Sequence, residues 1–166
     1  MGLQNTEKQN QFKKIAVVAD HRGEEYIRFV IKALDELGIQ SIVPEYEKGE
    51  TNDYPDMVVA ANKLLQAKKV DAMILLCGTG VGMSIAANKC KNVRCVLAND
   101  EATAAFGRIH EDCNALAMCT KYSDDNAGLE VRMCKRKLQR IVKMFATTEF
   151  AGGRHLRRIE KLNNMK

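Results

Sequence analysis

Short apolar runs alternate with amphipathic stretches along most of this chain, and this alternation is what most constrains its fold. In the first amphipathic stretch, apolar residues keep helical spacing up to a terminating Gly38. Apolar strands separated by helices are typical of a parallel sheet covered on both faces. The sequence therefore predicts a single three-layer, doubly wound α/β domain of Rossmann-like type. Its five parallel strands are expected at 14–19, 40–46, 71–77, 93–98 and 115–119.

The helices are expected at 24–38, 54–69, from the glycines after residue 77 to about 90, and around 100–109. The segment 125–147 is expected to close the domain. Its inner side would carry Leu129, Met133, Ile141, Val142 and Phe145. Residues 1–12 are polar and without periodicity, which indicates a flexible leader. The domain then spans 13–166 and includes a C-terminal helical extension.

Composition narrows the class of protein. A chain of 166 residues with 46% hydrophobic and 28% charged residues suits one soluble domain, and its apolar runs are too short to span a bilayer. Six cysteines show no CxxC spacing, and there are only three histidines. This pattern favours reduced thiols in the cytoplasm and argues against a metal site.

The net charge of +5 admits an anionic partner, which could be a small phosphate or a nucleic acid. Much of the basic excess lies in 134–140 and 152–161, and aromatic residues make up only 5% of the chain. Nucleic-acid binders usually interleave basic and aromatic residues, so we expect no nucleic-acid partner and no membrane contact. The first basic cluster is best explained as a solvated helix face.

In a doubly wound sheet, ligands bind beyond the carboxyl ends of the strands. The polar residues directly after the strands are therefore the candidates for a site. They are Asp20 and His21 after the first strand, 77–82 after the third, and Asn99 and Asp100 after the fourth.

The loop after the third strand has glycines at every second position. Its G-x-G-x-G pattern follows the third strand, whereas a dinucleotide fingerprint reads G-x-G-x-x-G near the first. Backbone N–H groups at Gly78, Gly80 and Gly82 can approach an anion or oxyanion closely, although a plain tight turn would use the same residues. Cys77 stands at the mouth of this loop, either as a small buried hydrophobe or as a nucleophile or base.

The remaining candidates also have two interpretations. His110 closes a helix, where it could simply cap carbonyl groups. Arg154 and Arg158 are four residues apart, so on a helix they share a face and could grip one phosphate. A surface helix often produces the same spacing.

Five motifs follow one another along the chain, namely ADHRG (19–23), NDYPD (52–56), CGTGVGMSIAANK (77–89), IHED (109–112) and EFAGGRHLRRIEKL (149–162). In this order and spacing they resemble the ribose-5-phosphate isomerase B family and its galactose-6-phosphate isomerase relatives. The resemblance runs from about residue 13 to 162.

The resemblance implies an aldose–ketose isomerase of carbohydrate metabolism, without metal or cofactor. It would interconvert ribose 5-phosphate and ribulose 5-phosphate through an enediolate, as in the pentose phosphate pathway. The alternatives are an isomerase of a hexose 6-phosphate (allose or galactose), a catalytically impaired relative that only binds a sugar phosphate, and a nucleic-acid binder using the basic C-terminal segments.

The resemblance also implies roles for single residues. Cys77 matches the base that moves a proton between C1 and C2, and Thr79 matches the hydroxyl that assists it. His110 matches the residue that opens the sugar ring. The other matches are Gly78, Gly80 and Gly82 for the oxyanion, Asp20 and Tyr54 for sugar hydroxyls, and His21, Arg154 and Arg158 for the phosphate. Family members are homodimers, so a homodimer with shared sites, or a tetramer built from it, is expected, with the second subunit supplying His110.

Two positions of the expected substrate-binding set depart from the family pattern. Glu111 stands where Asn is usual, and Lys121 stands where Arg is usual. An ionised Glu111 would repel an enediolate. Glu111 would therefore either pair with a cation such as Lys121, Arg22 or Arg108, or point away and accept hydrogen bonds from sugar hydroxyls, and we favour the pairing.

Overall fold

The apolar runs form one parallel sheet in the computed structural model, which describes residues 10–45 and 53–165. Its strands are β1 (Lys14–Ala19), β2 (Gln40–Ile42), β3 (Ala72–Cys77), β4 (Cys95–Leu97) and β5 (Ala115–Cys119). Their order in the sheet is β2-β1-β3-β5-β4, and every neighbouring pair is parallel. The predicted five-stranded sheet is confirmed.

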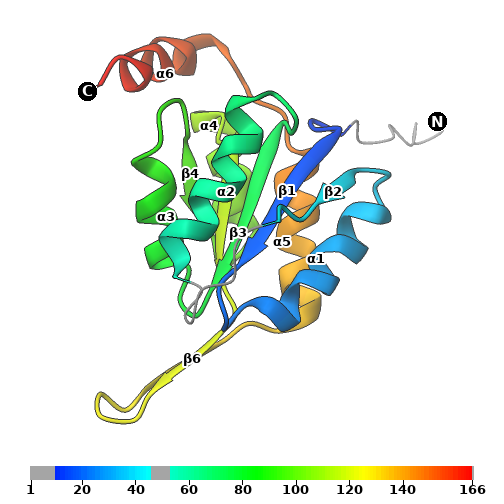
Figure 1. The fold of residues 1–166 in the computed structure, drawn as a ribbon. Coiled ribbons are helices and arrows are strands. Elements are labelled where there is room, and N and C mark those ends of the chain that lie inside the picture. The colour runs from blue at the N-terminus through cyan, green and yellow to red at the C-terminus, as the bar shows by residue number, and fades with distance from the viewer. Residues whose placement is uncertain (1–9, 46–52, 166) are drawn as a thin grey trace, which may run out of the picture.

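Helices cover both faces of this sheet (Figure 1). On one face lie α1 (Glu24–Asp35), α4 (Glu101–Glu111) and α5 (Lys135–Thr147), and on the other lie α2 (Tyr54–Gln66) and α3 (Val81–Asn88). Local signals explain several helix ends: Pro55 stands in the first turn of α2, and the Asp100 side chain accepts the Thr103 N–H to cap α4. The three-layer α/β architecture is as predicted.

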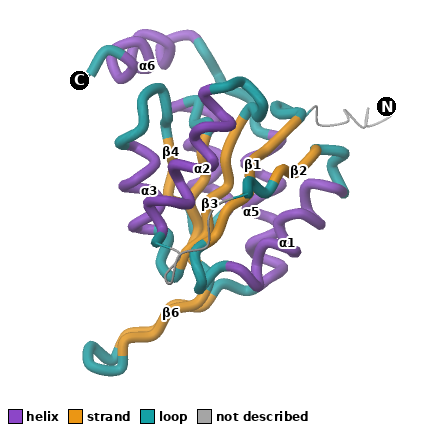
Figure 2. Tube along the Cα trace, in the orientation of Figure 1, coloured by secondary structure: helices purple, strands orange, loops and turns teal. Residues whose placement is uncertain are grey.

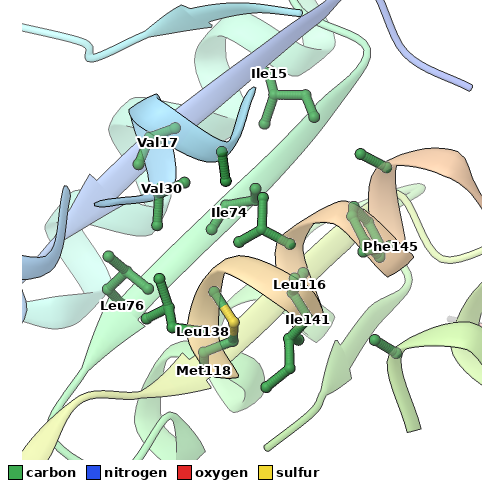
Figure 3. Close-up of a cluster of buried hydrophobic side chains, with 14 of the residues drawn as sticks. Ile15, Val17, Val30, Ile74, Leu76, Leu116, Met118, Leu138, Ile141 and Phe145 are labelled. Carbon is green, nitrogen blue, oxygen red and sulfur yellow. The ribbon is translucent and has the colours of Figure 1, made fainter. Parts of the chain in front are cut away.

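The central strand β3 shows why the apolar runs do not alternate with polar residues. All six of its residues are buried. Ile74 and Leu76 pack against the α1 and α5 side, as Figure 3 shows, while Met73 and Leu75 pack against the α2 and α3 side. Burying such a side chain stabilises the fold by roughly 1.5–3 kcal/mol. A polar residue on either face of β3 would lose that contribution.

The strand order reverses between β1 and β3. The chain leaves β1 for β2 on one side and leaves β3 for β4 and β5 on the other. We call the edge at the carboxyl ends of the strands the carboxyl edge, and the opposite one the amino edge. A crevice at the carboxyl edge, between β1 and β3, is where such sheets bind ligands.

The segment after β5 differs from the prediction. A hairpin of β6 (Lys121–Asp124) and β7 (Leu129–Arg132) precedes α5 and projects from the carboxyl edge (Figures 1 and 2). Leu129, expected on the inner side, is 69% exposed, whereas the other four expected inner residues are buried. The chain reverses because the Asp124 carboxylate accepts the N–H groups of Asn126 and Ala127, and Gly128 takes a left-handed conformation.

The chain ends at the amino edge. A 3₁₀ turn, η1 (Gly153–His155), leads into α6 (Leu156–Asn163), which forms the expected helical extension. Most of the predicted leader lies outside the described residues and stays a prediction. Phe12, at its end, is buried and stacks on Phe145 with ring centroids 5.4 Å apart. Among the described helices, none has the length and apolar character needed to cross a bilayer.

Candidate active site

A cysteine faces the glycine loop at the carboxyl edge. Cys77 is the last residue of β3 and is buried. The backbone N–H of Gly80 donates a hydrogen bond to Cys77 Sγ at 3.1 Å. This bond orients the sulfur as a hydrogen-bond acceptor, which is the orientation that a proton-accepting base requires.

A side chain at Gly80 would force its neighbours to move. Its φ of +81° is left-handed, and a Cβ there would lie 2.5 Å from Leu97 Cδ1 and 2.9 Å from the backbone carbon of Met118. The loop backbone therefore presses directly against β4 and β5. Gly80 is also the residue before α3, whose first-turn N–H groups have no partner within the helix. Such groups are suited to a developing negative charge.

The other two glycines lie under larger side chains. A Cβ on Gly82 would lie 2.9 Å from Tyr54 Cζ, so the Tyr54 ring rests on this glycine. A Cβ on Gly78 would lie 3.1 Å from both Arg22 Cδ and Tyr122 Cβ. The Arg22 guanidinium in turn lies 4.7 Å from the centre of the Tyr122 ring. The three glycines thus let these side chains close over the loop.

Asp20 folds the loop after β1. Its buried carboxylate accepts the backbone N–H groups of Arg22 at 2.9 Å and Gly23 at 3.2 Å. His21 lies exposed in the same turn, beside the carboxyl end of β3. The Asp-His pair expected from the sequence is therefore at the carboxyl edge with Cys77.

Thr79 lies in the glycine loop, where its Oγ1 accepts the N–H of Val81 at 3.3 Å. The hydroxyl proton can therefore point elsewhere, as an assisting donor would require. Lys121 is exposed at the start of β6, at the same edge.

Sequence reasoning missed Thr120, which is fully buried beside Cys77. Its N–H donates to the carbonyl oxygens of Cys77 at 3.0 Å and Gly78 at 3.1 Å. Its Oγ1 lies 2.9 Å from the Cys77 carbonyl oxygen and 3.1 Å from that of Arg22. Thr120 is the first polar residue after a buried strand, and that signal could have found it.

Two other polar residues at this edge hold the backbone. Asn99 Oδ1 accepts the N–H of Cys119 at 3.0 Å. Asp100 accepts the N–H of Thr103 at 2.7 Å, and this bond lowers the pKa of the Asp100 carboxyl. Both side chains are used for folding.

The amino edge carries a stack of aromatic rings. His110, in the last turn of α4, lies between Phe106 at 5.2 Å and His155 at 4.5 Å, measured between ring centroids. His155 is buried, and its Nδ1 has no hydrogen-bond partner among the described residues. Burial, and next the neighbouring His110, lower the pKa of His155. The stack therefore favours a neutral His155.

Three charged side chains surround this stack. Arg154 and Arg158 are exposed, and their charges also lower the pKa of His155, whereas Glu111 raises it. The two arginines lie on the C-terminal segment, which the Ala151 N–H joins to the end of α4 through the carbonyl oxygen of Ile109.

The expected site residues thus fall into two groups at opposite edges. The helix α4 starts after β4 at the carboxyl edge and runs back to the amino edge before β5 (Figure 1). The carboxyl edge holds Cys77, Thr79, Gly78, Gly80, Gly82, Asp20, His21, Tyr54 and Lys121, and the amino edge holds His110, Glu111, Arg154 and Arg158.

The expected pairing of Glu111 with Arg108 is wrong. Arg108 forms an ion pair with Asp112 at 2.8 Å, because a side chain four residues further along a helix is its natural neighbour. Lys121 and Arg22 lie at the other edge, so neither meets Glu111 within one chain. No ion pair joins Glu111 to another residue in the part of the chain that the structure describes.

Known proteins are similar to this chain over most of its length. The model of the Ribose/Galactose Isomerase family matches residues 15–162. The chain belongs to this family. Among relatives of this isomerase, "Putative sugar phosphate isomerase YwlF" of Bacillus subtilis is 41% identical over 91% of this chain and 95% of that protein. Ribose-5-phosphate isomerase B of Escherichia coli is 34% identical over 90% of this chain and 94% of that protein.

Solved structures agree with the family assignment. The type B ribose 5-phosphate isomerase of Trypanosoma brucei matches with a TM-score of 0.79 and 30% identity, covering 91% of this chain and 97% of that chain. This family assignment makes the chain an enzyme and an isomerase, and it confirms the resemblance inferred from the motifs. In the described part of this isomerase, no group of three or more His, Cys, Asp or Glu residues lies close enough to hold a metal ion.

Proposed function

We propose that this chain is a sugar-phosphate isomerase that interconverts ribose 5-phosphate and ribulose 5-phosphate. The names of its Escherichia coli and Trypanosoma brucei relatives support this substrate. Its six cysteines are all free, which fits a reducing compartment such as the cytoplasm.

The carboxyl edge supplies the chemistry. The Cys77 thiolate takes the proton from C2 of the open-chain aldose, and the C1 carbonyl oxygen becomes an enediolate oxygen. N–H groups of the glycine loop and the first turn of α3 stabilise that oxygen. The Cys77 thiol then returns the proton to C1 while the C2 hydroxyl loses its own, which leaves a ketone at C2. The Thr79 hydroxyl relays protons between the two oxygens.

The amino edge of a second copy completes the site. His110 opens the sugar ring, and Arg154 and Arg158, together with His21 of the first copy, hold the phosphate. Asp20 and Tyr54 contact sugar hydroxyls. These roles require a homodimer because the two groups of residues lie at opposite ends of one sheet.

The exposed outer strand β4 supports such a dimer. β4 is the last strand of the sheet and is only half-buried. Exposed apolar side chains flank it on both faces: Val81 and Ile85 on α3, and Phe106 on α4. A second copy related by a two-fold axis would cover this strip with its own β4 running antiparallel. That arrangement brings the amino edge of one copy to the carboxyl edge of the other.

The observation that carries this proposal is the Cys77 sulfur held at 3.1 Å by the Gly80 N–H at the switch point of the sheet. A coupled assay with ribose 5-phosphate, allose 6-phosphate and galactose 6-phosphate tests it, with the exchange of the C2 proton followed in D₂O. Preference for ribose 5-phosphate supports the proposal. Preference for a hexose 6-phosphate would mean that the substrate is that hexose phosphate and not ribose 5-phosphate. Binding without exchange would indicate a relative that has lost catalysis.

Mixing two inactive variants tests the shared site. Cys77→Ala and His110→Ala each remove one half of the site, so a mixed dimer holds one intact site and one doubly defective site. Random reassembly then restores roughly a quarter of wild-type activity, because about half of the dimers are mixed. Activity that stays at the level of the separate variants would mean that each chain works alone.

A further inference from the structure

The hairpin of β6 and β7 stands away from the rest of the chain (Figures 1 and 2). Every residue from Asp125 to Arg132 is exposed. Four residues per strand carry the hairpin about 13 Å outward at roughly 3.3 Å per residue. A two-stranded hairpin is at best marginally stable by itself in water, so a partner surface would stabilise the part of this one that projects beyond its root.

The root of the hairpin is fixed in direction. Thr120, the residue before β6, bonds to the carbonyl oxygens of Cys77 and Gly78. Tyr122, the second residue of β6, lies under the Arg22 guanidinium. Met133, the residue after β7, donates its N–H to the Thr120 carbonyl oxygen at 2.7 Å, so both strands are held at the same point. The hairpin therefore leaves the carboxyl edge directly beside the Cys77 loop.

The hairpin presents an apolar strip and an acidic tip. Tyr122 pairs directly with Val131, and Leu129 lies two residues further along the same face of β7. Val131 and Leu129 are 38% and 69% exposed. Between positions 123 and 130 the only charged residues are acidic, namely Asp124, Asp125 and Glu130, of which Glu130 forms an exposed ion pair with Arg132 at 3.3 Å.

The helix α6 has the opposite character. It exposes Leu156 and Leu162, and it carries Arg157, Arg158 and Lys161 against the single acid Glu160. Only Ile159 of the helix is buried.

The rest of α6 lies loosely on the body of the chain. Arg94 donates to Asn163 Oδ1 at 3.1 Å, and a cleft of about 1160 Å³ opens between the end of α6 and the loop before β4. One face of α6 is therefore free for another partner.

We infer that the β6–β7 hairpin is an arm that binds α6 of a second copy of this chain. The inference rests on the proposed function, because a shared site brings the amino edge of one copy to the carboxyl edge of the other. The arm leaves that carboxyl edge, and α6 lies at that amino edge. The acidic tip meets Arg157 and Lys161 of α6, while Leu129 and Val131 meet its exposed leucines.

Three variants test the arm. In the first, Asn-Gly replaces residues 123–130, so that Tyr122 and Val131 still pair beside a two-residue turn. The second combines Asp125→Lys with Glu130→Lys. The control combines Glu25→Lys with Asp35→Lys on α1, which changes the net charge equally at exposed positions of a helix that packs against β1 and β2, at the other end of the sheet from β4.

The dimer dissociation constant, measured by sedimentation velocity, is the readout. Both arm variants raise it at least roughly tenfold and the control leaves it unchanged. Adding Arg157→Glu and Lys161→Glu to the variant with the charge-reversed arm lowers the dissociation constant again, because the two surfaces then carry opposite charges once more. An unchanged constant in both arm variants, with circular dichroism showing that they are folded, would overturn the inference, as would a wild type that is monomeric.

Activity separates this inference from the proposed function. The wild type could be a dimer that isomerises no sugar phosphate, while both arm variants dissociate. That result would reject the proposed substrate and support the arm. If the wild type isomerises ribose 5-phosphate and both arm variants stay dimeric, the proposed function is supported and the role of the arm is rejected.

Discussion

The two edges of the sheet are built in different ways. At the carboxyl edge, the groups around Cys77 are held by short bonds: Gly80 N–H to Sγ at 3.1 Å, Asp20 to two backbone N–H groups, and Thr120 to the Cys77 carbonyl oxygen. At the amino edge, Arg154 and Arg158 are exposed, and the His110 and His155 rings make stacking contacts.

This difference matches the two tasks of the proposed reaction. Moving a proton at carbon needs a base and donors at fixed positions, so the carboxyl edge is preorganised. Holding a phosphate needs positive charge on long side chains, which the exposed arginines provide, and ring opening is left to His110. The contrast predicts large losses of turnover from changes at the carboxyl edge and losses of affinity from changes at the amino edge.

The largest effect is expected from Cys77→Ala. Turnover and exchange of the C2 proton fall by about a thousandfold, because general base catalysis contributes roughly 10²–10⁴ in rate. The affinity for ribose 5-phosphate, measured by calorimetry, changes little since the phosphate is held elsewhere. The exposed Cys134, changed to Ala, is the control and keeps full activity. Retention of more than a few per cent of turnover in Cys77→Ala would contradict the role of the sulfur.

The next effect is expected from Gly80→Ala. The added Cβ meets Leu97 and the Met118 backbone and must adopt a left-handed φ, so the unfolding free energy falls by at least about 2 kcal/mol and turnover falls with it. Gly38→Ala is the matched control, because its φ of +69° imposes the same strain with no atom within 4 Å of the new Cβ. Equal stability losses in the two variants, measured by urea unfolding, would mean that the close packing of the loop is unimportant.

At the amino edge, Arg154→Ala and Arg158→Ala are expected to act on affinity. Each removes a charge-assisted bond to the phosphate worth about 1.5–3 kcal/mol, which raises KM roughly tenfold or more while kcat changes less. Inorganic phosphate competes with substrate in the wild type. Arg136→Ala, at an exposed position of α5, serves as control and leaves KM unchanged. Unchanged KM in both test variants would move the phosphate site away from this segment.

A smaller change is expected from Glu111→Gln. In the proposed dimer we expect Glu111 of one copy to face Lys121 and Arg22 of the other, so that removing its charge frees a cation for the phosphate. KM then falls about two- to fivefold with little change in kcat, whereas Glu149→Gln has no effect. A double-mutant cycle with Lys121→Met measures the coupling, and strictly additive effects would show that the two residues do not interact.

The smallest effect is expected from His155. Its folded pKa is lowered, first by burial and next by His110, while the unfolded value is near 6.5. The unfolded chain therefore binds a proton more readily, so stability is highest above pH 6.5 and falls as the pH drops toward the folded pKa. His155→Phe keeps the stack and removes this pH dependence, which thermal unfolding between pH 5 and 8 can measure. An identical pH dependence in wild type and variant would contradict the assignment.

The sequence was most informative where structure depends on local patterns. The sheet, its helices and the Cys77 loop follow from apolar runs and glycine spacing within a few residues of each other. Leu129 shows the limit, because its apolar character fitted a core position while its real environment depends on a turn made by Asp124.

Features that depend on strand order could not be read in this way. Thr120 contacts Cys77 only because β5 lies beside β3 in register. His110 and Cys77 lie apart only because α4 runs back across the sheet. Neither fact has a signal within a short stretch of sequence, and the separation of His110 from Cys77 was expected only through the family resemblance, which gives His110 to the second subunit.

The packing of the Cys77 loop also fixes when it can form during synthesis. The loop leaves the ribosome well before its supports, since Gly80 rests on Leu97 and Met118 and Thr120 closes the turn at Cys77. A nascent chain that ends before Thr120 has the complete glycine loop but nothing to shape it. The Cys77 sulfur is therefore positioned only late in translation, after β5, the strand beside β3, has been made.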